Sequence, residues 1–298
     1  MKVLSRDATT AALPYDDLAA ALAEVLIASR EKRVVAPERA VHSLPNAGTL
    51  LLMPAWDEKL GVLKRVSVHP ANSERGLPQV QAEVLVFDAR TGEPRLLLDG
   101  AVVTARRTAA LSLLAVRTLQ IRKPRQVLII GAGAQARAHL EALAALQPER
   151  VYVYNRTFSR AARLTAHGRG LGLSVQTVPF PDEVAPAVDL IVTATASPAP
   201  VVPEEVSDSA MVVAVGAFTP AMAELPPALV AKARLYVDTL EGARAEAGDL
   251  IQAGVDWARV SSLAEALDAP PQEGGPVIFK SVGSALWDLA AARLVYGT

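Results

Sequence analysis

The sequence predicts an α/β protein with a Rossmann-type parallel-sheet domain and a second domain of α+β type. In residues 126–238 short apolar strands alternate with helical segments, a pattern typical of a parallel sheet covered by helices. The stretch VLIIGAGAQARAHLEAL (127–143) is typical of a strand, a tight glycine turn and a helix. Residues 37–99 instead contain short strands that follow one another directly.

Three helices are predicted around the α+β domain. Leucines and alanines recur at helical spacing in residues 14–33, after acidic residues in the first turn. Helical periodicity returns at 104–119 and again at 280–297. The last helix is expected to pack back on the first lobe, so this domain comprises residues 1–115 and 280–298.

The strands of both domains are predicted from short apolar runs. In the α+β domain these runs are GTLLLMP, GVLKRVSV and AEVLVFD, and ARTGEPRLLLD is predicted to form a hairpin around Thr91 and Gly92. The Rossmann domain is predicted to span 116–279, with strands at QVLIIG, RVYVYN, SVQTV, DLIVTAT, AMVVAVG and ARLYVD.

Composition excludes several classes of function. The 298 residues are 51% hydrophobic and carry a formal net charge of −1, so bulk electrostatics favours neither nucleic acid nor an anionic membrane. The absence of cysteine excludes disulfides, thiol nucleophiles and cysteine-bound metals, and the four histidines show no metal-ligand spacing. There is no signal-peptide pattern and no apolar run of about 18 residues, so we expect a cytoplasmic protein.

The glycine turn has the pattern G-x-G-x-x-A and predicts a dinucleotide site. Gly131 allows the tight turn, Gly133 lets the backbone approach a pyrophosphate, and the small Ala136 lets helix and strand pack closely. The helix that starts at Ala134 and Gln135 offers free N–H groups and a positive dipole end to the phosphates. Such a turn can join any strand to a helix, but here a second strand follows, which favours dinucleotide binding.

The end of that second strand indicates which cofactor binds. Enzymes specific for NAD place an acid there for the ribose 2′-hydroxyl, whereas this chain has Asn155, Arg156 and Thr157. An arginine suits a 2′-phosphate, and Arg160 lies one helical turn further on. We therefore expect NADPH, with NADH bound more weakly. The alternative is that Arg156 is only a solvated residue at the start of a helix.

Nine stretches together resemble the ornithine cyclodeaminase/μ-crystallin family, in order and over nearly the whole chain. They are PERAVH, LLMPAW, KRVSVHP, TARRTAA, IIGAGAQA, YNRT, AVGAFTP, EAGDL and FKSVGSALWD. The resemblance implies a Rossmann lobe, a substrate-binding and dimerisation lobe made of the N-terminal region and the last helix, and a homodimer. The family includes cyclodeaminases, an alanine dehydrogenase, opine-type synthases and ketimine reductases.

The resemblance also implies a substrate pocket that contains three cations. Arg39 matches an arginine that clamps the substrate carboxylate, Lys64 matches a pocket lysine, and Arg107 matches a second carboxylate-side cation that also lies near the nicotinamide. Three cations from three separate segments are consistent with this if they converge on one small acid, since a guanidinium can hold a carboxylate through two hydrogen bonds.

Further cofactor contacts follow from the same resemblance. It implies cofactor-side roles for Thr108, Thr195, Ala196 and Ser281. Glu246 and Asp249 are either cofactor-side residues or ordinary helix-end residues.

Two departures from the family pattern decide the expected reaction. Cyclodeaminases carry an aspartate where this chain has Phe218 and a glutamate where it has Leu51. Loss of ammonia needs a titratable group, which phenylalanine lacks. A preference for NADPH also favours net reduction over the internal recycling of the nicotinamide that a cyclodeaminase performs.

The reaction that fits is the reduction of a cyclic ketimine acid, either 1-pyrroline-2-carboxylate to L-proline or 1-piperideine-2-carboxylate to L-pipecolate. Phe218 and Leu51 would contact the hydrocarbon ring, and Arg39 and Arg107 would hold the carboxylate. Lys64 would keep or deliver the proton on the imine nitrogen. This small substrate is the expected partner.

Two alternatives remain open at this stage. The protein could be a cyclodeaminase or amino-acid dehydrogenase of the same family, or a non-catalytic NADPH-dependent ligand-binding protein, as μ-crystallin is. The three pocket cations argue against the second alternative, because a hydrophobic ligand would not need them.

Overall fold

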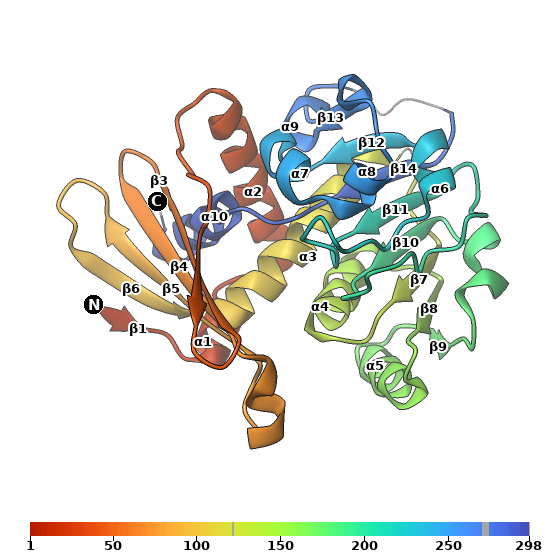
Figure 1. The fold of residues 1–298 in the computed structure, drawn as a ribbon, viewed down its shortest axis with the longest axis horizontal. Coiled ribbons are helices and arrows are strands. Elements are labelled where there is room, and N and C mark those ends of the chain that lie inside the picture. Colours follow the sequence, from red (N-terminus) through yellow and green to blue (C-terminus); the bar gives the residue numbers. More distant parts are fainter. Residues whose placement is uncertain (121, 270–273, 298) are drawn as a thin grey trace. The chain divides into compact units, whose positions relative to one another are not determined.

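The computed structural model describes residues 1–120, 122–269 and 274–297, which form two compact units (Figure 1). Unit 1 comprises Met1–Leu111 and Ser284–Thr298, and unit 2 comprises Ser112–Gly283. Their bounds lie a few residues from the 115/116 and 279/280 boundaries expected from the sequence. Each unit is built on one sheet of its own.

Unit 1 contains a six-stranded sheet in the order β1-β6-β5-β4-β3-β2. Strands β2 to β6 pair with their sequence neighbours in antiparallel fashion, and only β1 is parallel to β6. The predicted hairpin joins β5 to β6, where Gly92 has φ +76°. The strands are β1 (Lys2–Val3), β2 (Ala40–Leu44), β3 (Gly48–Trp56), β4 (Leu60–Val68), β5 (Val80–Asp88) and β6 (Pro94–Asp99).

Helices α2 (Tyr15–Arg30) and α10 (Ala285–Tyr296) pack on each other, and α10 also packs on β3 and β4. Every residue of α10 from Ala285 to Ala292 is buried, which is typical of a helix enclosed by other elements. Unit 1 also contains α1 (Arg6–Ala11) and the first part of α3 (Gly100–Leu119).

The helix predicted at 280–297 begins later than expected. Lys280 is the last residue of a strand, Gly283 has φ +86°, and the Ser284 side chain caps α10 by accepting a hydrogen bond from the Leu286 N–H. A helix cannot pass through a residue with this backbone conformation, so it starts at Ala285.

Unit 2 contains eight strands that are all parallel, in the order β13-β12-β14-β11-β10-β7-β8-β9. Two of them, β13 and β14, are absent from the prediction. The strands are β7 (Gln126–Ile130), β8 (Arg150–Tyr154), β9 (Val175–Thr177), β10 (Leu190–Thr193), β11 (Met211–Ala214), β12 (Arg234–Val237), β13 (Val260–Ser262) and β14 (Val277–Lys280).

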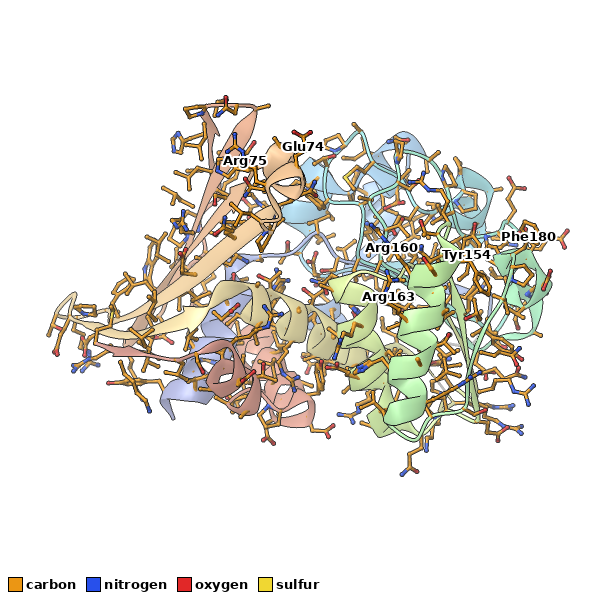
Figure 2. All side chains as sticks on the ribbon, turned by 90° about the horizontal axis from the view of Figure 1, so that it is seen from below. Glu74, Arg75, Tyr154, Arg160, Arg163 and Phe180 are labelled. Carbon is orange, nitrogen blue, oxygen red and sulfur yellow. The ribbon has the colours of Figure 1, made fainter. Side chains whose placement is uncertain are left out.

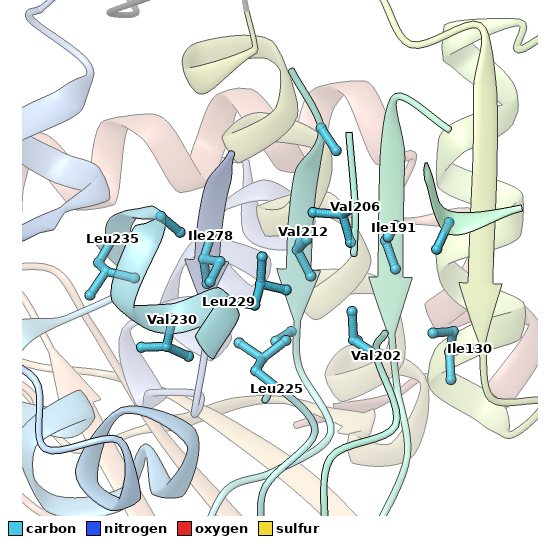
Figure 3. Close-up of a cluster of buried hydrophobic side chains, with 14 of the residues drawn as sticks. Ile130, Ile191, Val202, Val206, Val212, Leu225, Leu229, Val230, Leu235 and Ile278 are labelled. Carbon is cyan, nitrogen blue, oxygen red and sulfur yellow. The ribbon is translucent and has the colours of Figure 1, made fainter. Parts of the chain in front are cut away.

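The central strands of unit 2 are buried along their whole length because helices and loops cover both faces of the sheet. All residues of β10, β11 and β14 are buried, as expected for a parallel sheet. Figure 3 shows Ile130, Ile191, Val212 and Ile278 on neighbouring strands, with Leu229 in the same buried cluster. The helices are α4 (Ala134–Leu143), α5 (Phe158–Gly170), α6 (Pro227–Lys232), α7 (Leu240–Glu246), α8 (Gly248–Gln252) and α9 (Leu263–Ala266).

The strand order of unit 2 reverses at β7. From β7 the chain proceeds to β8 and β9 on one side, and then returns to β10 and β11 on the other side. In sheets of this kind, ligands bind beyond the carboxyl ends of the strands at the point of reversal. The fold is therefore the predicted α/β architecture with a Rossmann-type sheet. Among the helices of the described residues, none is long and apolar enough to cross a membrane.

Candidate functional site

The glycine turn between β7 and α4 forms a cradle for phosphate groups. Gly131 has φ +116°, and a Cβ at this position would lie 2.6 Å from the Ala194 carbonyl oxygen, so only glycine fits. Gly133 is the N-cap of α4, and a Cβ added to it would point into open space. Ala136 is fully buried under the turn. The cradle fits a pyrophosphate, because backbone can approach it closely and the N–H groups of α4, including those of Ala134 and Gln135, start there.

A buried histidine supports the first turn of α4. His139 Nδ1 donates to the Gln135 carbonyl oxygen, and its Nε2 therefore accepts from the Ser112 hydroxyl, both at 2.8 Å. Burial lowers the pKa of His139 from 6.5 to about 4, so the ring is neutral at physiological pH. His139 thus fixes the helix start without adding charge.

The segment after β8 presents cations where the adenosine half of a dinucleotide would lie. Arg156, Thr157 and Arg160 are exposed, and the half-buried Asn155 donates from Nδ2 to the Thr157 carbonyl oxygen at 3.0 Å. Figure 2 labels Arg160 on α5 and Tyr154 at the end of β8. The segment from Tyr154 to Arg160 contains no carboxylate, so a negatively charged group is not repelled there.

The segments after β10 and β11 hold three of the other predicted site residues. The Thr195 N–H and hydroxyl both donate to Glu224, at 2.6 and 2.8 Å, whereas Ala196 next to it is exposed. The Phe218 side chain is 50% exposed. An exposed aromatic ring at this edge of the sheet is available to a ligand.

Three further residues of unit 2 are held by their neighbours. The Ser281 hydroxyl is buried and donates to Asp238 at 2.7 Å. Asp249 lies in the first turn of α8, is 1% exposed and accepts hydrogen bonds from the Glu224 and Leu225 N–H groups. Glu246 is the half-buried last residue of α7.

Unit 1 contains a buried group of charges around Asp288 of α10. Lys64 of β4 makes an ion pair with Asp288 at 2.7 Å, and Arg107 Nε of α3 lies 3.6 Å from the other carboxylate oxygen. Asp288, Lys64 and Arg107 are 0%, 2% and 5% exposed. The charge of Arg39, just before β2, also acts on Lys64. We call Arg39, Lys64, Arg107 and Asp288 the cationic cluster.

The register of the sheet places Leu51 on the same face as Lys64. Leu51 pairs with Val66 and Met53 pairs with Lys64, and side chains two residues apart on a strand point the same way. Leu51 is half-buried, so it presents an apolar side chain on the sheet face that carries Lys64. Thr108, next to Arg107, donates its hydroxyl to the Thr104 carbonyl oxygen of its own helix at 2.8 Å.

The surroundings of Lys64 lower its pKa toward neutral pH. Burial lowers the pKa of Lys64 from 10.5 to about 8, the negative charge of Asp288 raises it, and the positive charges of Arg107 and Arg39 lower it. A lysine with this pKa can hold or release a proton near neutral pH, which is what a general acid or base requires.

The structure thus brings Arg39, Lys64 and Arg107 into one cluster, with Leu51 on the face that carries it. Three positive charges and one negative charge in this cluster create a positive field that attracts a small anion. Sequence reasoning missed Asp288. A signal for it exists in SALWDLAAARL, because an acid within an otherwise apolar helix must have a buried partner.

The chain is similar to known proteins over nearly its whole length. The model of the ornithine cyclodeaminase/mu-crystallin family matches residues 2–298. A Delta(1)-pyrroline-2-carboxylate reductase 2 of Burkholderia ambifaria is 44% identical over 288 residues, which cover 96% of this chain and 92% of that protein. A Delta(1)-pyrroline-2-carboxylate/Delta(1)-piperideine-2-carboxylate reductase of Azospirillum brasilense is 44% identical over 287 residues, with the same coverage.

A solved structure is similar over the whole chain. The Delta(1)-pyrroline-2-carboxylate reductase of Thermococcus litoralis, in complex with NADH and L-proline, superposes with a TM-score of 0.93 at 28% identity. The match covers 100% of this chain and 97% of that chain. These three relatives are reductases, and the solved one binds a nicotinamide cofactor together with a cyclic amino acid.

Proposed function

The chain belongs to the ornithine cyclodeaminase/mu-crystallin family, and we propose that it is an NADPH-dependent reductase of cyclic ketimine acids. Its substrates are 1-pyrroline-2-carboxylate, which gives L-proline, and 1-piperideine-2-carboxylate, which gives L-pipecolate. The relatives at 44% identity that are named for these reactions support the proposal.

The single observation that carries the proposal is the cationic cluster. Lys64 and Arg107 are almost fully buried and share one carboxylate. A buried cation is costly unless an anion or hydrogen-bond acceptor compensates for it. The carboxylate of a small imino acid would supply negative charge to Arg39 and Arg107, and the apolar Leu51 suits its ring.

Lys64 supplies the proton in the proposed mechanism. When bound, the reduced nicotinamide supplies a hydride to the imine carbon. An imine accepts hydride more readily when its nitrogen is protonated, and the Lys64 ammonium can hold or deliver that proton. Asp288 keeps Lys64 charged, because its negative charge raises the pKa that burial lowers.

The residues of unit 2 fit a nicotinamide dinucleotide with a 2′-phosphate. The glycine cradle of Gly131 and Gly133 would hold the pyrophosphate, and Arg156 and Arg160 would hold the 2′-phosphate. A hydrogen bond to a charged group contributes about 1.5–3 kcal/mol, which is roughly ten- to a hundredfold in affinity. This supports a preference for NADPH over NADH. Thr108, Thr195, Ala196 and Ser281 are proposed as further cofactor-side residues.

Phe218 supports reduction over ammonia loss. Its ring is 50% exposed and has no titratable group, so it can contact a hydrocarbon ring but cannot move a proton. The proposed role of Phe218 is therefore to contact the substrate ring.

An apolar row on the second face of the unit 1 sheet supports a homodimer. Pro54, Leu63, Leu85, Leu97 and Val3 are successive partners across five strands, on the face opposite to Lys64. Val3 is 65% exposed. An apolar face of this kind is suited to pairing with a second copy. A dimer in gel filtration that becomes a monomer in Leu85→Asp would support this, and a monomeric wild type would contradict it.

The test of the proposed function follows NADPH absorbance with purified protein and each ring in turn. Rapid NADPH loss with 1-pyrroline-2-carboxylate or 1-piperideine-2-carboxylate is the expected result, with slower loss when NADH replaces NADPH. Ornithine is the control substrate. Ammonia release from ornithine without turnover of either ring would contradict the proposal and indicate a cyclodeaminase.

A further inference from the structure

A second group of buried charges lies in unit 2, and we call its members, Glu224, Asp249 and Lys280, the sheet-edge network. They are 0%, 1% and 0% exposed. Lys280 Nζ makes an ion pair with Asp249 at 2.7 Å and donates to the Ala217 carbonyl oxygen at 2.6 Å. Asp249 in turn accepts hydrogen bonds from the backbone N–H groups of Glu224 and Leu225, at 2.5 and 2.9 Å.

The Glu224 carboxylate joins the segments that follow two neighbouring strands. Its Oε1 accepts from the Thr193 hydroxyl at 2.7 Å and from the Thr195 N–H and hydroxyl at 2.6 and 2.8 Å, all after or at the end of β10. Its Oε2 accepts from the N–H groups of Gly216 and Ala217, after β11, at 2.6 and 3.0 Å. Five donors on one buried carboxylate fix both segments.

Glycines allow these segments to pack closely. A Cβ on Gly216 would overlap the backbone of Thr195, and a Cβ on Gly248 would lie 2.6 Å from the Thr219 carbonyl oxygen. Gln252 Nε2 donates to the Pro220 carbonyl oxygen at 2.8 Å. The segment that carries Phe218 is thus held both by Glu224 and by Gln252, the last residue of α8.

The two fixed segments lie where the nicotinamide half of the cofactor would bind. The pyrophosphate cradle follows β7, and the arginines for the adenosine half follow β8 on one side of it. The second half of a dinucleotide then lies on the other side of β7, beyond the carboxyl ends of β10 and β11. Those are the ends that Glu224 holds together.

We propose that Glu224 is a positioning residue that holds the Thr195 and Gly216–Ala217 segments in the shape that receives the nicotinamide half of the cofactor. Asp249 and Lys280 hold the backbone of Glu224 and of Ala217 in place. The inference rests on the proposed function. Its physical basis is preorganisation: groups fixed before binding lose less conformational freedom when the ligand arrives.

The experiment compares two ligands on the whole protein by titration calorimetry. NADPH uses both halves of the site, whereas adenosine 2′,5′-bisphosphate lacks the nicotinamide half. In Glu224→Gln an amide NH₂ faces the N–H groups of either Thr195 or Gly216, so one segment is released. We expect NADPH to bind about tenfold more weakly, as for the loss of about 1.4 kcal/mol, and the bisphosphate to bind within about twofold of wild type.

Two more variants separate positioning from a general loss of structure. Thr193→Val removes one hydrogen-bond donor to Glu224 from a fully buried position. We expect it to weaken NADPH binding about threefold and to leave binding of the bisphosphate unchanged. Asp189→Asn is the matched control, because its carboxylate accepts from the Arg125 and Gln126 N–H groups at the opposite end of the sheet, both at 2.8 Å. It should lower the melting temperature and leave both affinities unchanged.

The outcomes distinguish this inference from the proposed function. Equal weakening of both ligands in Glu224→Gln and Thr193→Val, or unchanged binding of both, would overturn the positioning role alone. If Glu224→Gln does not fold, the affinities of Thr193→Val for the two ligands test the positioning role alone. Wild-type protein that binds neither NADPH nor NADH would overturn the proposed function and this inference with it.

Discussion

The cationic cluster of unit 1 and the sheet-edge network of unit 2 both contain buried charges, yet they are built in opposite ways. In the network, two carboxylates and one ammonium are bonded to backbone N–H groups, threonine hydroxyls and a carbonyl oxygen. In the cluster, Lys64 and Arg107 lie against one carboxylate, and the charge of Arg39 acts on Lys64. The network stabilises a fixed shape, whereas the cluster has a positive field that suits a small anionic ligand.

The largest expected effect comes from removing the titrating group of the cluster. Lys64→Met keeps the length and the apolar stem of the side chain but removes the proposed proton donor. General acid catalysis contributes about 10²–10⁴-fold, so we expect kcat/KM for the cyclic imine to fall by that amount. The measurement is steady-state NADPH oxidation.

The neighbouring residue provides the control for that variant. Arg65 follows Lys64 on β4 but is exposed and paired with Glu83 at 2.7 Å. Arg65→Met should change kcat/KM little, because exposed ion pairs contribute about 0–1 kcal/mol. Nearly full turnover in Lys64→Met would show that another group delivers the proton.

Asp288→Asn is expected to reduce stability as well as activity. Lys64 would lose its only carboxylate within 4 Å among the described residues, and breaking a buried ion pair from one side costs about 3–5 kcal/mol. Urea unfolding measures the loss. The variant should also lose activity at lower pH than wild type, because the charge that raises the pKa of Lys64 is gone.

Binding of a ligand tests whether the cationic cluster binds a carboxylate or whether Asp288 has only a structural role. L-Proline carries the carboxylate that the cations are proposed to bind, so it should raise the unfolding midpoint of Asp288→Asn and of wild type. If proline stabilises neither protein, the cluster does not bind the carboxylate.

The comparison also shows how far the sequence could predict the site. The alternation of strands and helices and the glycine turn depend on local pattern, and both are visible in the sequence. The pairing of Lys280 with Asp249 is not visible in the sequence. The reason is that β14 inserts between β11 and β12, and the order of strands cannot be deduced from spacing. Asp288 was missed for a related reason: its partners Lys64 and Arg107 are far away in the chain.

A smaller effect is expected at the adenosine end of unit 2. Arg156→Ala should raise the KM for NADPH about ten- to a hundredfold and leave the KM for NADH unchanged, because only NADPH carries the 2′-phosphate. Arg150→Ala, at the start of β8 instead of its end, is the matched control and should change neither value. A similar change for both cofactors would contradict the 2′-phosphate role.

The smallest effect is expected in the pH profile of the wild type. It distinguishes the role of the cationic cluster from that of the sheet-edge network most directly. The pKa of Lys64 is about 8, so its ammonium is present below pH 8 and is lost as the pH rises through that value. Because the charged form is the proposed proton donor, kcat/KM should fall about tenfold per pH unit above pH 8. Lys64→Arg stays positively charged above pH 8, so the residual activity of this variant should not fall as the pH rises above 8. Glu224→Gln alters only the sheet-edge network, so it should lower NADPH affinity without moving the midpoint, and a shifted midpoint would mean that the two charged groups are coupled.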